Sequence, residues 1–278
     1  MPRFQGKVAV ITGSSSGIGA ATAVLFAKEG AQVTITGRNQ DGLVATKKAM
    51  LNAGANEGNL NMVIADVTDS QGRKQIISST IEKFGQLDIL VNNAGAAISG
   101  EDGTSGISAS TVLLEKVMKL NVYSVVDMIQ LARPYLAKTK GEVINISSIC
   151  GQPTSYAPVA YYAMSKAALD QMMRSAAIDL IKEGIRVNGV SPGVVVTQFA
   201  ENMLSNKEIA KQFYETFANK PGALPCGKVA VPSDIANVIA FLADRSQSSY
   251  IVGQTIVADG GTSIVLASNA DSAVPTAK

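Results

Sequence analysis

Histidine is absent from the 278-residue sequence. A Ser–His–Asp triad and a histidine-ligated metal site are therefore both excluded. Any chemistry has to use tyrosine, lysine, serine or carboxylate side chains, or a bound cofactor, and we expect no metal site.

Cysteine, runs of like charge and long apolar stretches are also scarce. The two cysteines, Cys150 and Cys226, form no CxxC pair, so a disulfide framework is not expected and a reducing compartment fits. The 24 Lys and Arg residues balance 22 Asp and Glu residues without a run of one sign, which gives no footprint for nucleic acid or a membrane surface. Apolar runs are short, and none precedes the first predicted strand as a signal peptide would. These absences predict a cytoplasmic protein without a membrane span.

Short valine- and isoleucine-rich runs alternate with helical patterns along the chain. Gly30, Gly85 and Gly184 each end a helical pattern just before a strand-like run, as a residue after a helix C-terminus often does. This alternation is typical of βαβ units, so we expect an α/β fold: a doubly wound, Rossmann-type parallel sheet of about seven strands with helices on both faces. The strands are expected at 7–12, 32–36, 62–65, 87–91, 142–147, 185–190 and 255–258. The helices are expected at 18–28, 41–53, 70–84, 111–137, 162–182 and 233–244.

No Pro/Gly/Ser-rich linker divides the chain, so residues 1–278 are expected to form one domain. The stretch 198–231 departs from the alternation and predicts two short helices, 200–206 and 207–218, followed by a Pro/Gly-rich loop. The tail 267–278 is small and polar and is expected to be poorly ordered at its end.

Glycines are concentrated between the first predicted strand and the first predicted helix, in the sequence TGSSSGIG at 12–19. Glycines let the backbone turn tightly and approach a pyrophosphate closely, while a helix N-terminus offers unpaired N–H groups and the positive end of its dipole. Serine hydroxyls add further donors. The spacing is G-x-x-x-G-x-G rather than the commoner G-x-G-x-x-G, and an ordinary strand-to-helix turn would fit the glycines alone.

Further motifs follow in a characteristic order: DV at 66–67, NNAG at 92–95, Asn121, ISS at 146–148, YxxxK at 162–166, SPG at 191–193 and FLAD…GQTIVADGG at 241–261. Together with TGSSSGIG they resemble the single-domain type of the short-chain dehydrogenase/reductase family over nearly the whole chain. The resemblance implies a nicotinamide-dependent oxidoreductase that moves a hydride between its cofactor and a carbonyl or secondary alcohol.

The cofactor is expected along the carboxyl ends of the strands. The glycine turn should hold the pyrophosphate, and the resemblance places adenine beside Asp66 and Val67, the adenosine ribose along NNAG, and the nicotinamide against SPG. The expected cofactor contacts are Gly13, Ser15, Ser16, Gly17, Ile18, Gly19, Arg38, Asp66, Val67, Asn93, Ala94, Gly95, Tyr162, Lys166, Pro192, Gly193, Val195 and Thr197. Asn92 is expected to be structural, a buried side chain bonded to neighbouring backbone.

The end of the second strand bears on the choice between NAD(H) and NADP(H). An acidic residue there accepts from the ribose 2′-hydroxyl of NAD, whereas an arginine accommodates the 2′-phosphate of NADP. Gly37 stands where NAD-preferring members of the family carry Asp. Arg38 follows it, and its planar guanidinium group suits bidentate hydrogen bonding to a phosphate. We therefore expect NADP(H), although an ordinary solvated arginine is the alternative.

The catalytic residues are expected to be Asn121, Ser148, Tyr162 and Lys166. Tyr162 and Lys166 are four residues apart and share one helix face; only Tyr162, not its neighbour Tyr161, has a lysine at that spacing. A free tyrosine has a pKa of about 10, which a nearby ammonium and an oxidised nicotinamide should lower, so that Tyr162 acts as acid and base. The resemblance gives Lys166 a second role on the nicotinamide ribose and gives Asn121 a water beside the lysine. Ser148 should donate to the substrate oxygen.

The substrate is expected between the 198–231 segment, acting as a lid, and the loops opposite. We expect contacts from Ser148, Gln152, Tyr156, Tyr162, Phe199 and Met203, with Ser155 and Ala97 in the opposite wall. The interval from Ser148 to Tyr162 is one residue longer than the family leads us to expect, which would alter that wall. Such a pocket favours a medium-sized, partly apolar carbonyl over a small hydroxylated sugar, unless the lid aromatics belong wholly to the core.

Two further expectations concern assembly and function class. The resemblance, with apolar positions on several sides of the 111–137 and 162–182 helices, predicts a homotetramer. The alternative to an active carbonyl reductase is a catalytically inactive dinucleotide-binding regulatory or scaffold protein, against which the intact catalytic set argues. An extended nucleotide-sugar epimerase would need a longer chain.

Overall fold

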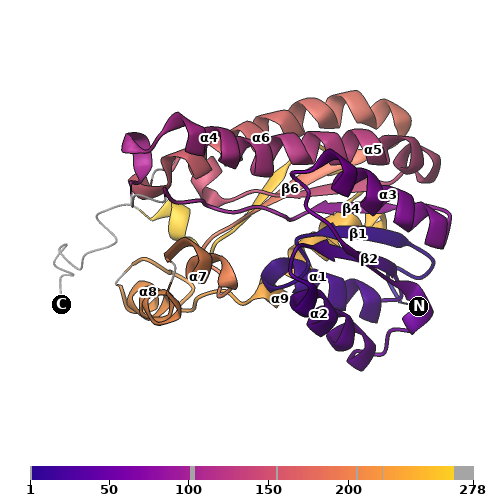
Figure 1. Ribbon diagram of the computed structural model, residues 1–278, viewed down its shortest axis with the longest axis horizontal. Coiled ribbons are helices and arrows are strands. Elements are labelled where there is room, and N and C mark those ends of the chain that lie inside the picture. Colours follow the sequence, from indigo (N-terminus) through magenta and orange to yellow (C-terminus); the bar gives the residue numbers. More distant parts are fainter. Residues whose placement is uncertain (1, 101–103, 155, 205, 221, 266–278) are drawn as a thin grey trace, which may run out of the picture.

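The centre of the structure is a seven-stranded parallel sheet in the order β3-β2-β1-β4-β5-β6-β7 (Figure 1). The computed structural model describes residues 2–100, 104–154, 156–204, 206–220 and 222–265. The strands are β1 Val8–Thr12, β2 Gln32–Gly37, β3 Leu60–Ile64, β4 Ile89–Asn92, β5 Glu142–Ile146, β6 Arg186–Pro192 and β7 Thr255–Ala258. The predicted doubly wound parallel sheet is confirmed, and every strand overlaps its expected range.

Apolar side chains on both faces explain why these segments form strands. Every residue of β1, β4, β5 and β6 is buried. In β1, Ala9 and Ile11 pack into one hydrophobic core and Val10 packs into the other, because successive strand residues point to opposite faces. Continuous apolar runs of this kind require cover on both faces of the sheet.

Helices supply that cover on both sides (Figure 1). One core contains residues of α1, α2 and α9, such as Phe26, Leu43 and Ile239, and the other contains residues of α3, α5 and α6, such as Ile76, Met128 and Leu169. These helices are α1 Gly17–Lys28, α2 Gln40–Asn52, α3 Ser70–Phe84, α5 Ser124–Thr139, α6 Ala160–Leu180 and α9 Pro232–Ala243.

The expected helical stretch 111–137 is confirmed, with a π-helical turn inside it that was not expected. The structure divides this stretch into α4 (Thr111–Met118), a π-helical turn (Lys119–Tyr123) and α5. The turn carries Asn121, which is fully buried. A π-helical turn inserted in a helix is frequent at functional sites, and the apolar periodicity of a sequence does not reveal it.

The loops at the carboxyl edge of the sheet position the site. β2 and β3 extend the sheet on one side of β1, and the chain then crosses over so that β4 pairs with the other side of β1. In open α/β sheets, ligands bind at the switch point where the strand order reverses in this way. The helices α7 (Gln198–Leu204) and α8 (Lys207–Asn219) follow β6 and contact each other at the left of Figure 1. They correspond to the two short helices expected, whereas the tail 267–278 lies outside the described residues.

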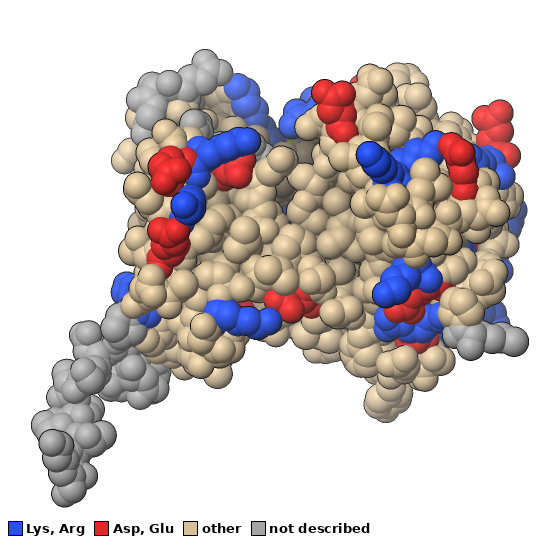
Figure 2. Space-filling view, turned by 90° about the horizontal axis from the view of Figure 1, so that it is seen from below, with Lys and Arg blue, Asp and Glu red and all other residues tan. Residues whose placement is uncertain are grey.

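The outer surface shows charges of both signs side by side. On the face drawn in Figure 2, Lys and Arg lie close to Asp and Glu, and uncharged residues occupy much of its middle. Within the described ranges, none of the helices has both the length and the apolar composition needed to cross a membrane.

Candidate active site

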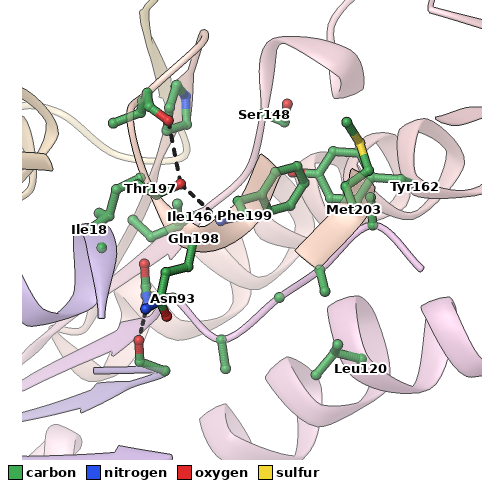
Figure 3. Close-up of a pocket in the computed structure, with 18 of the residues that line it drawn as sticks. Ile18, Asn93, Leu120, Ile146, Ser148, Tyr162, Thr197, Gln198, Phe199 and Met203 are labelled. Atoms are coloured by element: carbon green, nitrogen blue, oxygen red, sulfur yellow. Dashed lines mark hydrogen bonds between the residues drawn. The ribbon is translucent and has the colours of Figure 1, made fainter. Parts of the chain in front are cut away.

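A cavity of about 540 Å³ opens at the carboxyl edge of the sheet. It runs from the glycine turn after β1, past the ends of β2, β4 and β5, to α6 and α7, and Figure 3 shows part of its lining. Most of the predicted site residues line it: Gly13, Ser15, Ser16, Gly17, Ile18, Arg38, Asp66, Val67, Asn93, Ala94, Gly95, Ala97, Ser148, Tyr156, Tyr162, Lys166, Pro192, Gly193, Val195, Thr197, Phe199 and Met203. Gly19, Asn121 and Gln152 are not in this lining.

The glycine turn forms a cradle with no room for side chains. Gly13 and Gly17 have φ angles of 64° and 56°, a region that glycine adopts readily. A Cβ on Gly13 would lie 2.8 Å from the Cα of Ala94. Ser16 precedes α1 without a side-chain capping bond to any described residue, and the first residues of α1, Gly17 and Ile18, line the cavity. This geometry fits the pyrophosphate of a dinucleotide.

Two residues near the turn are structural rather than exposed to the cavity. A Cβ on Gly19 would lie 2.4 Å from the Gly13 carbonyl oxygen, so Gly19 packs directly against the turn, and its contact with the cofactor stays a prediction. Ser14 is fully buried, donating to the Ile11 carbonyl oxygen at 2.9 Å and accepting from the Thr36 N–H at 2.8 Å. Both residues hold the turn in shape.

Asn93 and Thr12 join the glycine turn to the loop after β4. Asn93 Nδ2 donates to the carbonyl oxygens of Thr12 and Gly13 at 2.9 and 3.0 Å, and Thr12 Oγ1 accepts from the Ala94 N–H at 3.0 Å. Asn92 is buried as expected, but its amide donates to the side chain of Asn145 at 2.9 Å and not to backbone.

Arg38 lies at the far end of the cavity from the catalytic residues. Its side chain is 78% exposed, and its Nη1 is 3.7 Å from Asp66 Oδ2. Asp66 Oδ1 accepts from the N–H and the hydroxyl of Thr68. Burial opposes ionisation of Asp66, but these hydrogen bonds and the Arg38 charge bring the pKa of its carboxyl below the ordinary value. Asn39, which sequence reasoning missed, also lines this end and caps α2 by accepting from Gly42 N–H.

Ser148 and Tyr162 both line the opposite end of the cavity (Figure 3). Burial raises the pKa of the Tyr162 phenol above its ordinary value, and the nearby Ser148 hydroxyl only partly offsets this effect. The expected lowering of this pKa by Lys166 is therefore corrected: the phenolate is disfavoured by burial, and the Lys166 ammonium donates to the Ile146 carbonyl oxygen at 2.7 Å. The effect of an oxidised nicotinamide stays a prediction.

Lys166 lies deep in the site, with only 4% of its surface exposed. Its Nζ is 5.6 Å from the centre of the Tyr162 ring, and burial lowers the pKa of its ammonium to about 8, against the opposing effect of Asp170. Tyr161 turns the other way, and its buried hydroxyl donates to the Ala109 carbonyl oxygen at 2.6 Å. The structure thus separates the two neighbouring tyrosines.

Asn121 supports the site from below. Its Oδ1 accepts from the Ala96 N–H at 3.1 Å, and its Nδ2 donates to the Ala96 carbonyl and to Ser165 Oγ at 3.0 and 2.9 Å. A Cβ on Gly95 would lie 3.1 Å from Asn121 Oδ1 and 3.2 Å from Lys166 Nζ. The amide and the ammonium therefore converge beneath Gly95, and the water expected beside them stays a prediction.

The helix α7 contacts Tyr162 through Phe199. The Phe199 and Tyr162 rings are 5.5 Å apart between centres, with Met203 beside them in Figure 3. Phe213 of α8 also lines the cavity. Tyr214 ties α8 to the residue before α7, since its hydroxyl accepts from Thr197 N–H at 3.2 Å and donates to the Thr197 carbonyl at 2.9 Å.

The wall opposite the lid differs from the expectation. Tyr156 lines the cavity and is half exposed. Gln152 does not line the cavity, because its amide donates to Asp170 and Ser191, and its contact with substrate stays a prediction. Ser155 lies outside the described residues. Cys150 and Val159, which the sequence analysis did not single out for this wall, take part in the lining.

The comparisons with known proteins identify the family. The sequence model described as "Enoyl-(Acyl carrier protein) reductase" matches residues 13–263. The chain is 33% identical over 270 residues to the 3-oxoacyl-[acyl-carrier-protein] reductase of Thermotoga maritima, covering 93% of this chain and 98% of the relative. The chain belongs to the short-chain dehydrogenase/reductase family.

Two solved structures from Caenorhabditis elegans extend this result. A short-chain dehydrogenase/reductase of unknown function, determined with its cofactor, has 49% sequence identity and a TM-score of 0.95, covering 97% of this chain and 100% of that chain. An apo-form glucose dehydrogenase has 48% identity and a TM-score of 0.82, covering 95% of this chain and 100% of that chain. The chain is thus a short-chain dehydrogenase/reductase of the oxidoreductase class that uses a nicotinamide dinucleotide.

Proposed function

We propose that this short-chain dehydrogenase/reductase is an NADP(H)-dependent carbonyl reductase, acting reversibly on a ketone or aldehyde and the corresponding alcohol. The observation that carries the proposal is the convergence of Ser148, Tyr162 and Lys166 at one end of a cavity whose other end is the glycine turn and Arg38. A catalytically inactive protein would have no need for these polar groups to converge on the cavity, with Ser148 and Lys166 buried.

The chain's own residues supply binding and proton transfer. When bound, a nicotinamide dinucleotide supplies or accepts the hydride. The Ser148 hydroxyl donates to the substrate oxygen, and the Tyr162 hydroxyl gives its proton to that oxygen in reduction and takes one back in oxidation. Lys166 uses one N–H on Ile146 and retains two more donors for the hydroxyls of the nicotinamide ribose.

The choice of NADP(H) rests on the end of β2. Arg38 is exposed at the cavity and follows Gly37, which has no carboxylate to accept from a ribose 2′-hydroxyl. Its contact with Asp66 is long, at 3.7 Å, so the guanidinium is free to turn toward a 2′-phosphate. Bidentate contacts between guanidinium and phosphate are among the stronger hydrogen bonds in proteins.

The substrate proposal rests on the lid, residues 198–231. Phe199, Met203 and Phe213 present apolar surface to the cavity opposite Tyr156, which suits a medium-sized, partly apolar carbonyl. The glucose dehydrogenase at 48% identity makes an aldose the competing substrate class.

A panel of carbonyls tests this proposal. We expect α-tetralone and 4-nitrobenzaldehyde to give a higher kcat/KM with NADPH than D-glucose gives with NADP⁺, measured by the absorbance of the reduced cofactor. A clear advantage for glucose would overturn the apolar pocket and leave the hydride chemistry intact. Tight NADPH binding without turnover of any carbonyl or alcohol would favour the regulatory or scaffold alternative.

We also propose a homotetramer in a reducing, cytoplasmic environment. Val112 and Tyr123 are exposed on the α4–α5 stretch and Met164 and Ile178 on α6, where two-fold contacts would cover them. Sedimentation velocity at micromolar concentration should give about four times the 28.8 kDa mass of the chain. A single species with the mass of one chain would refute this assembly.

A further inference from the structure

Gln152 belongs to a buried polar cluster behind the catalytic residues. Its Nε2 donates to Asp170 Oδ2 at 2.8 Å and to Ser191 Oγ at 3.3 Å. Asp170 is 3% exposed and Ser191 is fully buried. The Gln152 amide therefore joins three segments: the loop that begins at Ser148, the helix α6 and the end of β6. The helix α6 carries Tyr162 and Lys166, and the end of β6 carries Pro192.

The loop lies directly on the backbone of α6. A Cβ on Gly151 would lie 2.8 Å from the carbonyl carbon of Lys166 and 2.9 Å from its Cβ, so no side chain fits between loop and helix. Within the loop, Ser148 Oγ accepts from the Cys150 N–H at 3.1 Å. The distance from the Ser148 hydroxyl to Tyr162 therefore depends on how this loop is held against α6.

Asp170 also acts on Lys166 through its charge. It follows Lys166 by one helical turn, so the two side chains lie on the same face of α6. Burial raises the pKa of Asp170 and lowers that of Lys166, and each charge opposes the shift of the other.

The surroundings of Asp170 isolate this pair of charges. Among the described residues, the charged groups that act on Asp170 are Lys166 and Arg174, both on α6. The loop, β6 and β7 bring the neutral side chains of Ser147, Gln152, Ser191 and Thr255. Removing the Asp170 charge would therefore leave the buried ammonium without its neighbouring carboxylate.

We propose that Gln152 and Asp170 are positioning residues, whose hydrogen bond clamps the Ser148 loop onto α6 and fixes Ser148, Tyr162 and Lys166 in one catalytic geometry. The Asp170 carboxylate additionally favours the charged form of Lys166. The inference rests on the proposed catalytic function of these three residues.

The test uses an exchange of partners in the full-length protein. Gln152→Glu and Asp170→Asn each disturb the amide–carboxylate pair, and the double variant restores it with the donor on the other side. Gln171→Glu is the matched control, because Gln171 lies on the exposed side of α6 and contacts Arg174. Gly151→Ala is a second way to displace the loop from α6, because the added Cβ would clash with Lys166.

Two measurements test separately whether the loop is held against α6 and whether this contact supports turnover. Hydrogen exchange of the 147–154 segment needs neither cofactor nor substrate, and we expect faster exchange in both single variants and in Gly151→Ala. With 4-nitrobenzaldehyde and NADPH, we expect kcat to fall by about 10- to 100-fold in each single variant, with little change in the Kd for NADPH. The double variant should recover most of both properties.

The pH dependence of kcat distinguishes an effect of Asp170 on Lys166 from a purely structural role of Asp170. Since the carboxylate holds up the pKa of Lys166, Asp170→Asn should let the ammonium lose its proton at lower pH, and the alkaline fall in kcat should move to lower pH. Unchanged exchange and kcat in the single variants, or a double variant no better than either one, would overturn the clamp. Altered exchange in a protein that reduces no carbonyl would contradict the proposed function while leaving the clamp standing.

Discussion

Replacing Tyr162 by phenylalanine is expected to lower kcat by about 10²- to 10⁴-fold, the usual contribution of a general acid or base. The variant keeps the ring that lies 5.5 Å from Phe199 and loses only the phenolic hydroxyl. Cofactor affinity should change little, because the glycine turn and Arg38 lie elsewhere in the cavity. Steady-state turnover of 4-nitrobenzaldehyde with NADPH and fluorescence titration of NADPH measure the two quantities.

The control is the adjacent tyrosine. Tyr161→Phe removes a buried hydrogen bond to the Ala109 carbonyl oxygen, which we expect to cost about 0.5–1.5 kcal/mol of stability while most activity remains. If Tyr162→Phe kept turnover near that of the wild type, or if Tyr161→Phe were the inactive variant, Tyr162 would not be the acid and base.

Exchanging the residues at the end of β2 is expected to change the cofactor preference. In the double variant Gly37→Asp with Arg38→Ala, kcat/KM for NADPH should fall by about 10- to 100-fold, the order expected for a lost hydrogen bond to a charged group. The value for NADH should rise, because a carboxylate accepts from the ribose 2′-hydroxyl. Gly37 tolerates the new side chain: a Cβ there would lie 3.4 Å from Ser15 Oγ, an ordinary contact.

The matched control removes a cation outside the cavity. Lys48→Gln, on the exposed side of α2, should leave the ratio of the two kcat/KM values as it is in the wild type. Equal values for NADPH and NADH in the wild type would show that Arg38 does not bind the 2′-phosphate.

The sequence alone was sufficient to predict those features of the site that depend on the spacing of residues along one helix or turn. The glycines of the 12–19 turn predict a cradle because only glycine combines positive φ with close backbone approach, and Gly13 and Gly17 adopt such angles. The distinction between Tyr161 and Tyr162 follows from helix periodicity, which places Lys166 below only one of them.

The sequence alone was insufficient where the position of a side chain depends on contacts with residues that are distant in sequence. Gln152 stands in the loop expected to face substrate, yet its direction is set by Asp170 and Ser191, 18 and 39 residues away. The amide of Asn121 is bound by Ala96 and Ser165 across a π-helical turn. The pKa of Tyr162 depends on burial, which the four-residue spacing to Lys166 does not show.

The most direct test of the central claim follows the hydride itself. NADPH deuterated on either face of nicotinamide C4 is incubated with 4-nitrobenzaldehyde, and the alcohol product is examined by mass spectrometry. The account predicts deuterium on the carbinol carbon from one face only, formed rapidly by the wild type and at a small fraction of that rate by Tyr162→Phe. An alcohol product without deuterium from either face, or equal rates in the two proteins, would contradict it.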